Sequence, residues 1–180
     1  MSAEFALREA LRRDFARNRD GLTRAVLVVF RYGQWADRRK GAARILLALP
    51  HKVANLLLLR LAVGCDLPAQ TTCGPGLRLH HAGRGVALHR RAVLGADVTL
   101  FHDVAIGQRD NSGEPVLEDG VVVGVGARIL GPVRLGTGAR VGANAVVLDD
   151  VPAGGTALGP RATIRPANRS QAEPEGATAS

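Results

Sequence analysis

An aliphatic residue recurs at every sixth position over the C-terminal half of the chain, and this ladder is its clearest pattern. An Ala or Val stands four residues after each member of the ladder. A six-residue period with one inward aliphatic and one small residue predicts a short strand followed by a turn, and three such units make one triangular coil. We therefore expect a mainly β fold, a parallel β-helix whose narrow bore is filled by Leu, Ile and Val. The ladder runs through Leu117, Val123, Ile129, Leu135, Val141 and Val147.

The same count extends upstream to Leu67, and it is interrupted twice. A short insertion follows Leu79, and a longer one, the polar and turn-rich segment 108–115, follows Ile106. Insertions into a solenoid form loops, and loops on a rigid scaffold carry binding and catalytic residues.

Residues 4–63 carry a helical pattern instead, with apolar stretches at 22–36 and 42–63. Pro50 is expected to split or kink the second stretch. We expect these helices to bury their leucine faces against one another or against a neighbouring subunit, and to cover one open end of the coils. The predicted organisation is a helical region at 1–65, a β-helix domain at 66–165 and a disordered tail at 166–180.

The helical region holds the whole charge excess of the chain. The formal net charge is +8, and residues 1–65 contain 13 Lys and Arg against 5 Asp and Glu, while the remainder is balanced. The longest uncharged apolar run here, 53–59, is far shorter than the roughly 20 residues that span a bilayer, so we expect no transmembrane helix. Basic residues beside apolar ones do allow peripheral membrane contact, and no nucleic-acid partner is expected.

Composition narrows the picture further. Hydrophobic residues make up 46% of the 180 residues, which excludes wholesale disorder, whereas aromatic residues make up only 3%. Cys65 and Cys73 form neither a disulfide framework nor a zinc knuckle, and Cys73 falls in an inward position of the ladder. Residues 1–20 are charged throughout, unlike a secretory signal. We therefore expect a cytoplasmic protein, and contact of its helices with the inner membrane face stays an open alternative.

Residues able to do chemistry gather in the first coils. Counting three units per turn places His81 and His102 at the same position one coil apart, so they should stack, and the loop 107–116 leaves the next face. We expect both histidines and the loop to cluster at one edge and form a functional site. Two alternatives stay open, since the histidines are either solvated surface groups or zinc ligands in need of a third partner. Asp66 is either a solvated turn carboxylate or a group that orients a histidine.

Together with the ladder, several segments resemble the serine O-acetyltransferase family of hexapeptide-repeat acyltransferases. The likeness is greatest to its short members from polysaccharide gene sets, and it covers about residues 66–165. The segments are Asp66 with His81 fifteen residues later, Val98-Thr-Leu-Phe-His-Asp-Val-Ala-Ile-Gly107, Val123-Gly-Val-Gly-Ala-Arg-Ile-Leu-Gly131 and Val141-Gly-Ala-Asn-Ala-Val-Val147.

This resemblance implies a left-handed β-helix, a homotrimer or dimer of trimers, and acetyl-CoA bound between neighbouring subunits, with no metal. It also implies that His81 is the general base and that Asp66 holds its imidazole in the right tautomer. Small side chains would leave room for the pantetheine arm, and an arginine would suit the phosphates. The positions that match this coenzyme groove are Gly126, Ala127, Arg140 and Ala143.

The sequence also departs from the family pattern. Gly113 and Glu114 stand where the serine enzymes carry an Arg-His pair that grips the serine carboxylate, and His80 stands where an Asp usually precedes the base. Because Glu114 would repel that carboxylate, we predict an acetyl-CoA-dependent O-acetyltransferase acting on a sugar or saccharide hydroxyl. His80, His102 and Glu114 would contact the acceptor. The alternatives are a genuine serine O-acetyltransferase, a zinc hydratase on the same fold, and a non-catalytic scaffold whose basic helices bind a partner.

Overall fold

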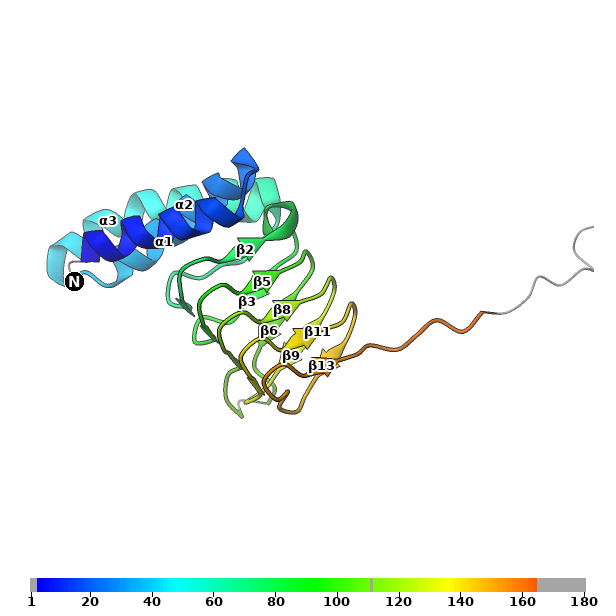
Figure 1. Cartoon of the computed structure of the whole chain (residues 1–180). Helices are drawn as coiled ribbons and strands as arrows, with labels where there is room; N and C mark the ends of the chain where they lie inside the picture. Colours follow the sequence, from blue (N-terminus) through cyan, green and yellow to red (C-terminus); the bar gives the residue numbers. More distant parts are fainter. Residues whose placement is uncertain (1–2, 111, 165–180) are drawn as a thin grey trace, which may run out of the picture.

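The computed structural model describes residues 3–110 and 112–164, and its larger part is a parallel β-solenoid with three faces (Figure 1). The first face contains β1 (Thr72–Cys73), β4 (Val93–Leu94), β7 (Val116–Leu117) and β10 (Arg134–Leu135). The second contains β2 (Arg78–Leu79), β5 (Thr99–Leu100), β8 (Val122–Val123), β11 (Arg140–Val141) and β13 (Thr156–Ala157). The third contains β3 (Ala87–Leu88), β6 (Ala105–Gly107), β9 (Arg128–Leu130) and β12 (Val146–Val147).

The predicted ladder forms the core of this solenoid. Its aliphatic residues stack in parallel register from coil to coil, as in the column Leu79, Leu100, Val123 and Val141. All four are buried, and the inward position predicted for Cys73 is confirmed by an exposure of 7%. Backbone N–H and C=O groups pair between coils, so each coil satisfies the hydrogen-bonding groups of the next coil.

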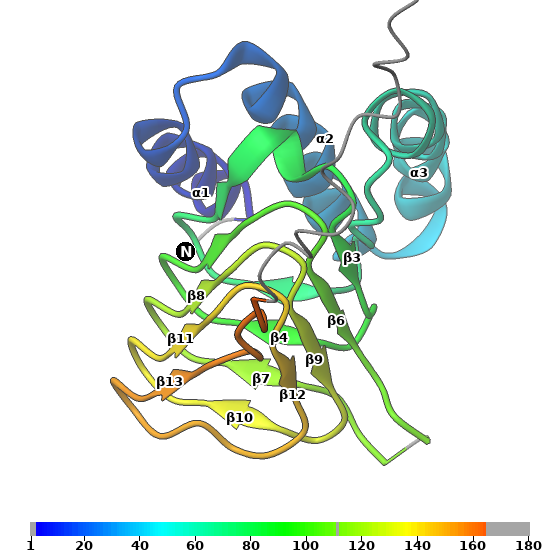
Figure 2. The same cartoon turned by 90° about the vertical axis from the view of Figure 1, so that its right-hand side faces the viewer.

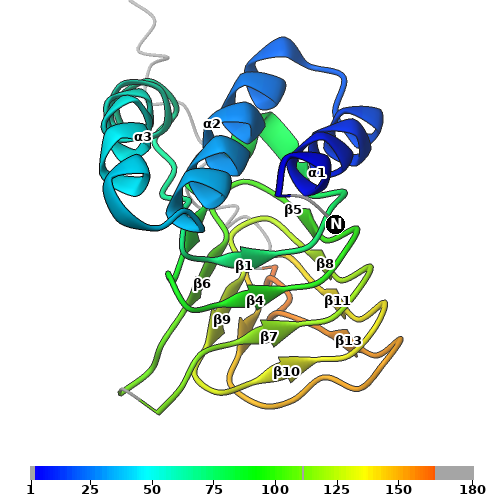
Figure 3. The same cartoon turned by 90° about the vertical axis from the view of Figure 1, so that its left-hand side faces the viewer.

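A layer of three helices covers the end of the solenoid at its first coil, which confirms the predicted cap (Figure 1). Helix α2 lies between α1 and α3 (Figures 2 and 3). Leu27 and Phe30 of α2 are fully buried in one cluster with Leu67 and Leu77 of the first coil. The helices are α1 (Ala3–Arg17), α2 (Gly21–Asp37) and α3 (Gly41–Ala54), followed by the π-helical segment η1 (Asn55–Val63) and, after β2, the short 3₁₀ segment η2 (His80–Gly83).

Pro50 does not split the third helix. The α-helix continues to Ala54 and passes directly into η1, so residues 41–63 form one continuous helix. It is the one helix in the described ranges that is long and apolar enough to cross a membrane by length and composition. The predicted tail at 166–180 lies outside the described residues.

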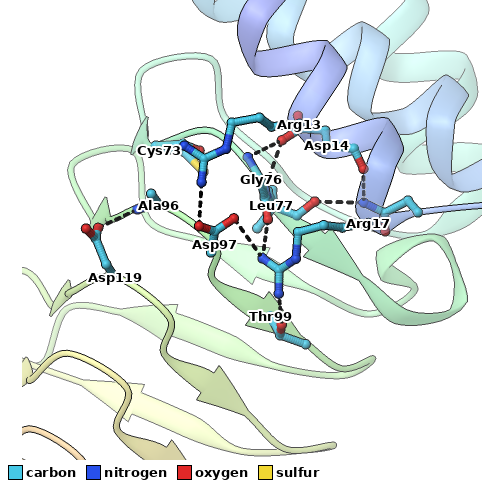
Figure 4. A network of polar contacts seen from close by, with 12 residues as sticks. Arg13, Asp14, Arg17, Cys73, Gly76, Leu77, Ala96, Asp97, Thr99 and Asp119 are labelled. Carbon is cyan, nitrogen blue, oxygen red and sulfur yellow. Dashed lines mark hydrogen bonds and ion pairs between the residues drawn. The ribbon is translucent and has the colours of Figure 1, made fainter.

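A buried polar network fastens the helical layer to the first coil (Figure 4). Asp14 of α1 accepts two hydrogen bonds from Arg31 of α2, at 2.8 and 3.1 Å, and both side chains are at most 3% exposed. Asp14 also accepts from the backbone N–H groups of Gly76 and Leu77 at 2.8 and 2.9 Å. Arg31 in turn donates to the carbonyl oxygen of Cys73 at 2.8 Å. The turn between β1 and β2 is therefore tied to two helices at once.

Candidate active site

His81 and His102 lie at the corner that joins the second face to the third. His81 stands in η2 between β2 and β3, and His102 stands one coil further on, between β5 and β6. Their ring centroids are 4.9 Å apart and the ring planes are nearly perpendicular, at 84°. The predicted stacking of the two histidines is therefore confirmed.

The backbone at this corner has an uncommon conformation. His81 and the following Ala82 both have positive φ angles, 53° and 58°. The other described residues with positive φ are glycines or the short polar residues Asp and Asn, which tolerate this region best. Two such residues in succession store strain of about 1–3 kcal/mol each, and strain of this kind concentrates at functional sites. The short insertion after Leu79 thus forms η2 and sets the direction of the His81 side chain.

A pocket of about 500 Å³ opens beside the two histidines. Besides the rings, Asp20 and Leu22 contribute from the start of α2, and Arg84 contributes from the solenoid. Asp20 caps α2 by accepting a hydrogen bond from the backbone N–H of Thr23 at 2.7 Å, through a single carboxylate oxygen. The pocket therefore presents a base, an anion and a cation together.

A second pair of rings lies beside the first. The ring of His80 stacks on that of Phe101, with centroids 3.9 Å apart and planes 9° from parallel. Burial lowers the pKa of His80, and the charges of Arg78, His81 and His102 lower it further. A neutral, flat aromatic pair therefore borders the histidine corner.

One atom at this corner has no partner. Nδ1 of His102 is buried and makes no hydrogen bond within the described chain. Buried polar atoms are nearly always satisfied, so a polar group of a ligand is a fitting partner for this nitrogen. Across residues 3–110 and 112–164, no three His, Cys, Asp or Glu side chains come together to hold a metal ion.

Asp66 does not meet His81 as predicted. Its carboxylate accepts a hydrogen bond from Arg60 of η1 at 3.0 Å and is about half exposed. The reason is its place in the fold, because Asp66 forms a β-bridge with Ala87 on the third face, beside the end of the long helix.

The predicted clustering of loop 107–116 with the histidines is wrong within one chain. The loop leaves after β6, at the far end of the third face, so one side of the triangular coil separates it from His81 (Figure 2). Glu114 accepts a hydrogen bond from Gln108 at 2.8 Å and forms an ion pair with Arg91. Within one chain its charge is therefore compensated by Arg91, at a different corner from the histidine pocket.

Of the four residues matched to the coenzyme groove, three lie at the surface or at a corner of the solenoid and one is buried in its bore. Gly126 and Ala143 lie at the same corner as the histidines in the following coils, and the N–H of Gly126 donates to the carbonyl of His102 at 3.1 Å. Arg140 is exposed on β11. Ala127, by contrast, is fully buried in the bore, so its side chain cannot line a groove.

The backbone of the solenoid itself requires glycine at position 126. Its φ is +69°, and a Cβ there would lie 2.1 Å from Oδ1 of Asn144 in the next coil. The close approach of Asn144 and the positive φ therefore require glycine at this position.

Nothing in the sequence pattern indicated that Asp20 and Arg84 would line the same pocket. They lie more than sixty positions apart, and only the packing of α2 over the first coil brings them together. The signal that was available for Asp20 was its position as a cap before an apolar helical stretch.

A family model and several curated proteins are similar in sequence to this chain. The family model "Bacterial transferase hexapeptide (six repeats)" matches residues 114–149. The chain is 40% identical over 108 residues to a serine acetyltransferase of Helicobacter pylori, covering 58% of this chain and 63% of the relative. It is 33% identical over 141 residues to that of Escherichia coli K12, covering 77% and 49%. The chain thus spans about half to two thirds of these relatives' length.

Solved structures of serine acetyltransferases are also similar to this chain. Soybean serine acetyltransferase complexed with serine superposes with a TM-score of 0.67 and 30% identity, over 88% of this chain and 68% of the soybean chain. Isoform 3 from Entamoeba histolytica has a TM-score of 0.71 at 17% identity, which shows the fold alone. The fold and the matching family model place the chain in the hexapeptide-repeat class of left-handed β-helices. Within that class, the chain belongs to the serine acetyltransferase family.

Proposed function

We propose that this protein transfers the acetyl group of acetyl-CoA to an alcohol hydroxyl, with His81 as general base. The observation that carries the proposal is the strained corner that presents His81 to a pocket beside His102. His81 takes the proton of the acceptor hydroxyl as that oxygen attacks the thioester carbonyl. The same proton then passes from the imidazolium to the departing coenzyme sulfur, so no acyl-enzyme is needed.

Acetyl-CoA supplies the activated acetyl group. Gly126 and Ala143, placed below His102 at the same corner, would leave space for its pantetheine arm, and Arg140 would pair with its phosphates. The homotrimer or dimer of trimers that the family resemblance implies, with the coenzyme between neighbours, stays part of this proposal.

The acceptor that we put first is serine. The similar proteins bear the name serine acetyltransferase. In addition, the pocket of about 500 Å³ holds a cation in Arg84 and an anion in Asp20, which are complementary to the carboxylate and ammonium groups of a free amino acid. His81 between them would meet the hydroxyl.

A saccharide is the second candidate, and a different observation favours it. The parallel rings of His80 and Phe101 offer a flat face of the kind that packs against the apolar face of a sugar. Such an acceptor would need neither Arg84 nor Asp20 for charge pairing.

Coenzyme release from acetyl-CoA tests the reaction. We expect His81→Ala to lower kcat by about 10²–10⁴-fold, the usual contribution of a general base. His89→Ala is the matched control, since His89 lies at a different corner, between β3 and β4, and should leave kcat unchanged. Equal turnover of the His81→Ala variant and the wild type would remove His81 from the mechanism.

The same assay across serine, amino sugars and oligosaccharides identifies the acceptor. For serine, Arg84→Ala should raise KM by about tenfold or more with a smaller effect on kcat, because a charged hydrogen bond is lost. Turnover of an oligosaccharide that exceeds turnover of serine and is lost in Phe101→Ala would overturn the serine assignment and establish the second candidate.

A further inference from the structure

The long helix formed by α3 and η1 exposes a stripe of large aliphatic side chains. No residue of α3 is buried, in contrast to α2, which buries eight. Single exposed apolar side chains are ordinary, but a continuous row of this size marks an interaction surface. The stripe consists of Ile45 (78% exposed), Leu46 (77%), Leu49 (65%), Val53 (50%), Leu56 (51%), Leu57 (56%) and Leu61 (70%).

The π-helical winding of η1 keeps this stripe continuous. An α-helix advances about 100° per residue, whereas the wider π-helix advances less. At α-helical pitch Arg60 would enter the stripe and Leu61 would leave it. With the wider turn, Leu61 continues the row of Ile45 and Leu49, while Leu59 faces the core with no exposure.

Basic residues border the stripe. Arg44, Lys52 and Arg60 are all exposed along this helix. Arg44 pairs with Asp37 at 2.7 Å and Arg60 with Asp66 at 3.0 Å, while Lys52 has no ion pair among the described residues. Residues 1–65 contain 13 cations against 5 anions, so the helical region as a whole carries a net positive charge. It is therefore complementary to an anionic partner.

A cavity adjoins the stripe and combines both chemistries. It has a volume of about 960 Å³ between the long helix, α2 and the start of the first coil. Aliphatic side chains such as Leu49 and Leu56 line it together with Lys52 and Arg60. Asp37 and Asp66 line it as well and pair with Arg44 and Arg60, so Lys52 is the cation that an anionic headgroup would meet. Apolar walls beside such a cation suit acyl chains that end in anionic headgroups.

The helix is better placed to lie on a bilayer than to cross it. It runs from Gly41 to Val63, so Lys52 stands at its middle, and spanning would bring an ammonium group to the centre of the hydrocarbon, at a high energetic cost. Its other side is also occupied by α2, whose Tyr32 hydroxyl donates to the carbonyl of Leu47 at 3.2 Å. This contact fixes which side of the helix faces α2 and leaves the side that carries the stripe toward solvent.

We propose that the helix 41–63 docks the protein on an anionic membrane surface, with the aliphatic stripe in the acyl region and the flanking cations at the headgroups. A second copy of the chain across a two-fold axis is a poorer occupant. Such a contact through this face would bring Lys52 and its neighbouring cations against the same cations of the other copy. Anionic lipid has the opposite charge and accepts the stripe without such repulsion.

Vesicle flotation of the full chain tests this docking. The protein should float with vesicles of phosphatidylglycerol and phosphatidylcholine in equal parts, and much less with phosphatidylcholine alone. Raising the salt from about 0.1 M to about 0.5 M should weaken binding, because the headgroup contacts are screened. The double variant Leu46→Gln, Leu49→Gln should bind at least about tenfold more weakly. Lys52→Gln should lose about fivefold, the value of one cation near an anionic surface.

Leu158→Gln is the matched control, because Leu158 is 75% exposed on the solenoid, far along the chain from the helix. It should float like the wild type. Wild-type protein that does not float, or a double variant that floats as well as wild type, would overturn the proposal. If the protein does not float and the double variant instead breaks an assembly in sedimentation velocity, the stripe is a contact between copies and the proposal is wrong.

Discussion

Replacing Asp14 by alanine should destabilise the attachment of the helical layer more than any surface substitution. The carboxylate is fully buried and accepts four hydrogen bonds, two from Arg31 and one each from the N–H groups of Gly76 and Leu77. Asp14→Ala leaves the Arg31 guanidinium buried without its counter-charge and two backbone donors without an acceptor. Breaking a buried ion pair by removing one partner costs about 3–5 kcal/mol.

Trp35, the single tryptophan, lies on α2 and reports on this layer. In a chain of this size each kcal/mol lowers Tm by about 2–4 °C, so we expect Asp14→Ala to lower the Tm followed by Trp35 fluorescence by about 6 °C or more. Arg44→Ala is the control, because its pair with Asp37 is largely exposed and worth no more than about 1 kcal/mol.

A double variant adds a second check. The double variant Asp14→Leu, Arg31→Leu leaves no unpaired buried charge. Its loss in free energy of unfolding should therefore be smaller, by more than about 1 kcal/mol, than the sum of the losses of the single variants Asp14→Leu and Arg31→Leu. If Asp14→Ala loses no more stability than Arg44→Ala, the pair is solvated in solution and the described docking of α1 on the first coil is wrong.

Three further predictions concern the rest of the molecule. Burial raises the pKa of Cys65 and of Cys73 to about 11, so neither thiol should react with a thiol reagent at neutral pH until the protein is unfolded. Burial lowers the pKa of His51 and of His80, so the unfolded chain takes up these protons first, and Tm should fall as the pH drops below about 6.5. Gly124→Ala should cost about 1–3 kcal/mol in urea unfolding, since its Cβ would lie 2.8–2.9 Å from backbone atoms of the next coil.

Each of these three predictions has a result that would contradict it or a control variant. Rapid labelling of both thiols in the folded protein would contradict the described burial. His51→Phe should lessen the acid loss of Tm, and an unchanged pH profile would refute the assignment. Gly21→Ala places its Cβ in open space at the start of α2 and should leave stability nearly unchanged.

The solenoid was predictable because its information is local. Each coil repeats one short unit, so the inward or outward direction of Leu79 or Leu100 follows from counting along the chain. The same counting placed His81 over His102 and identified the corner that carries the candidate site. It did not place loop 107–116 correctly within one chain, because the count located the start of the loop but not its distance from the histidines across the third face.

The sequence alone determined the period, the core residues of the β-helix and the stacked histidines, since one repeating unit specifies them. The contacts of Asp14 with Arg31 and of Asp20 near Arg84 depended on how the helices pack over the first coil. The pair of Asp66 with Arg60 depended on how η1 enters that coil. Hydropathy patterns show which side chains avoid water, but they do not show which distant element covers them. For that reason the stripe of the long helix became visible as an exposed surface only when its packing on α2 was known.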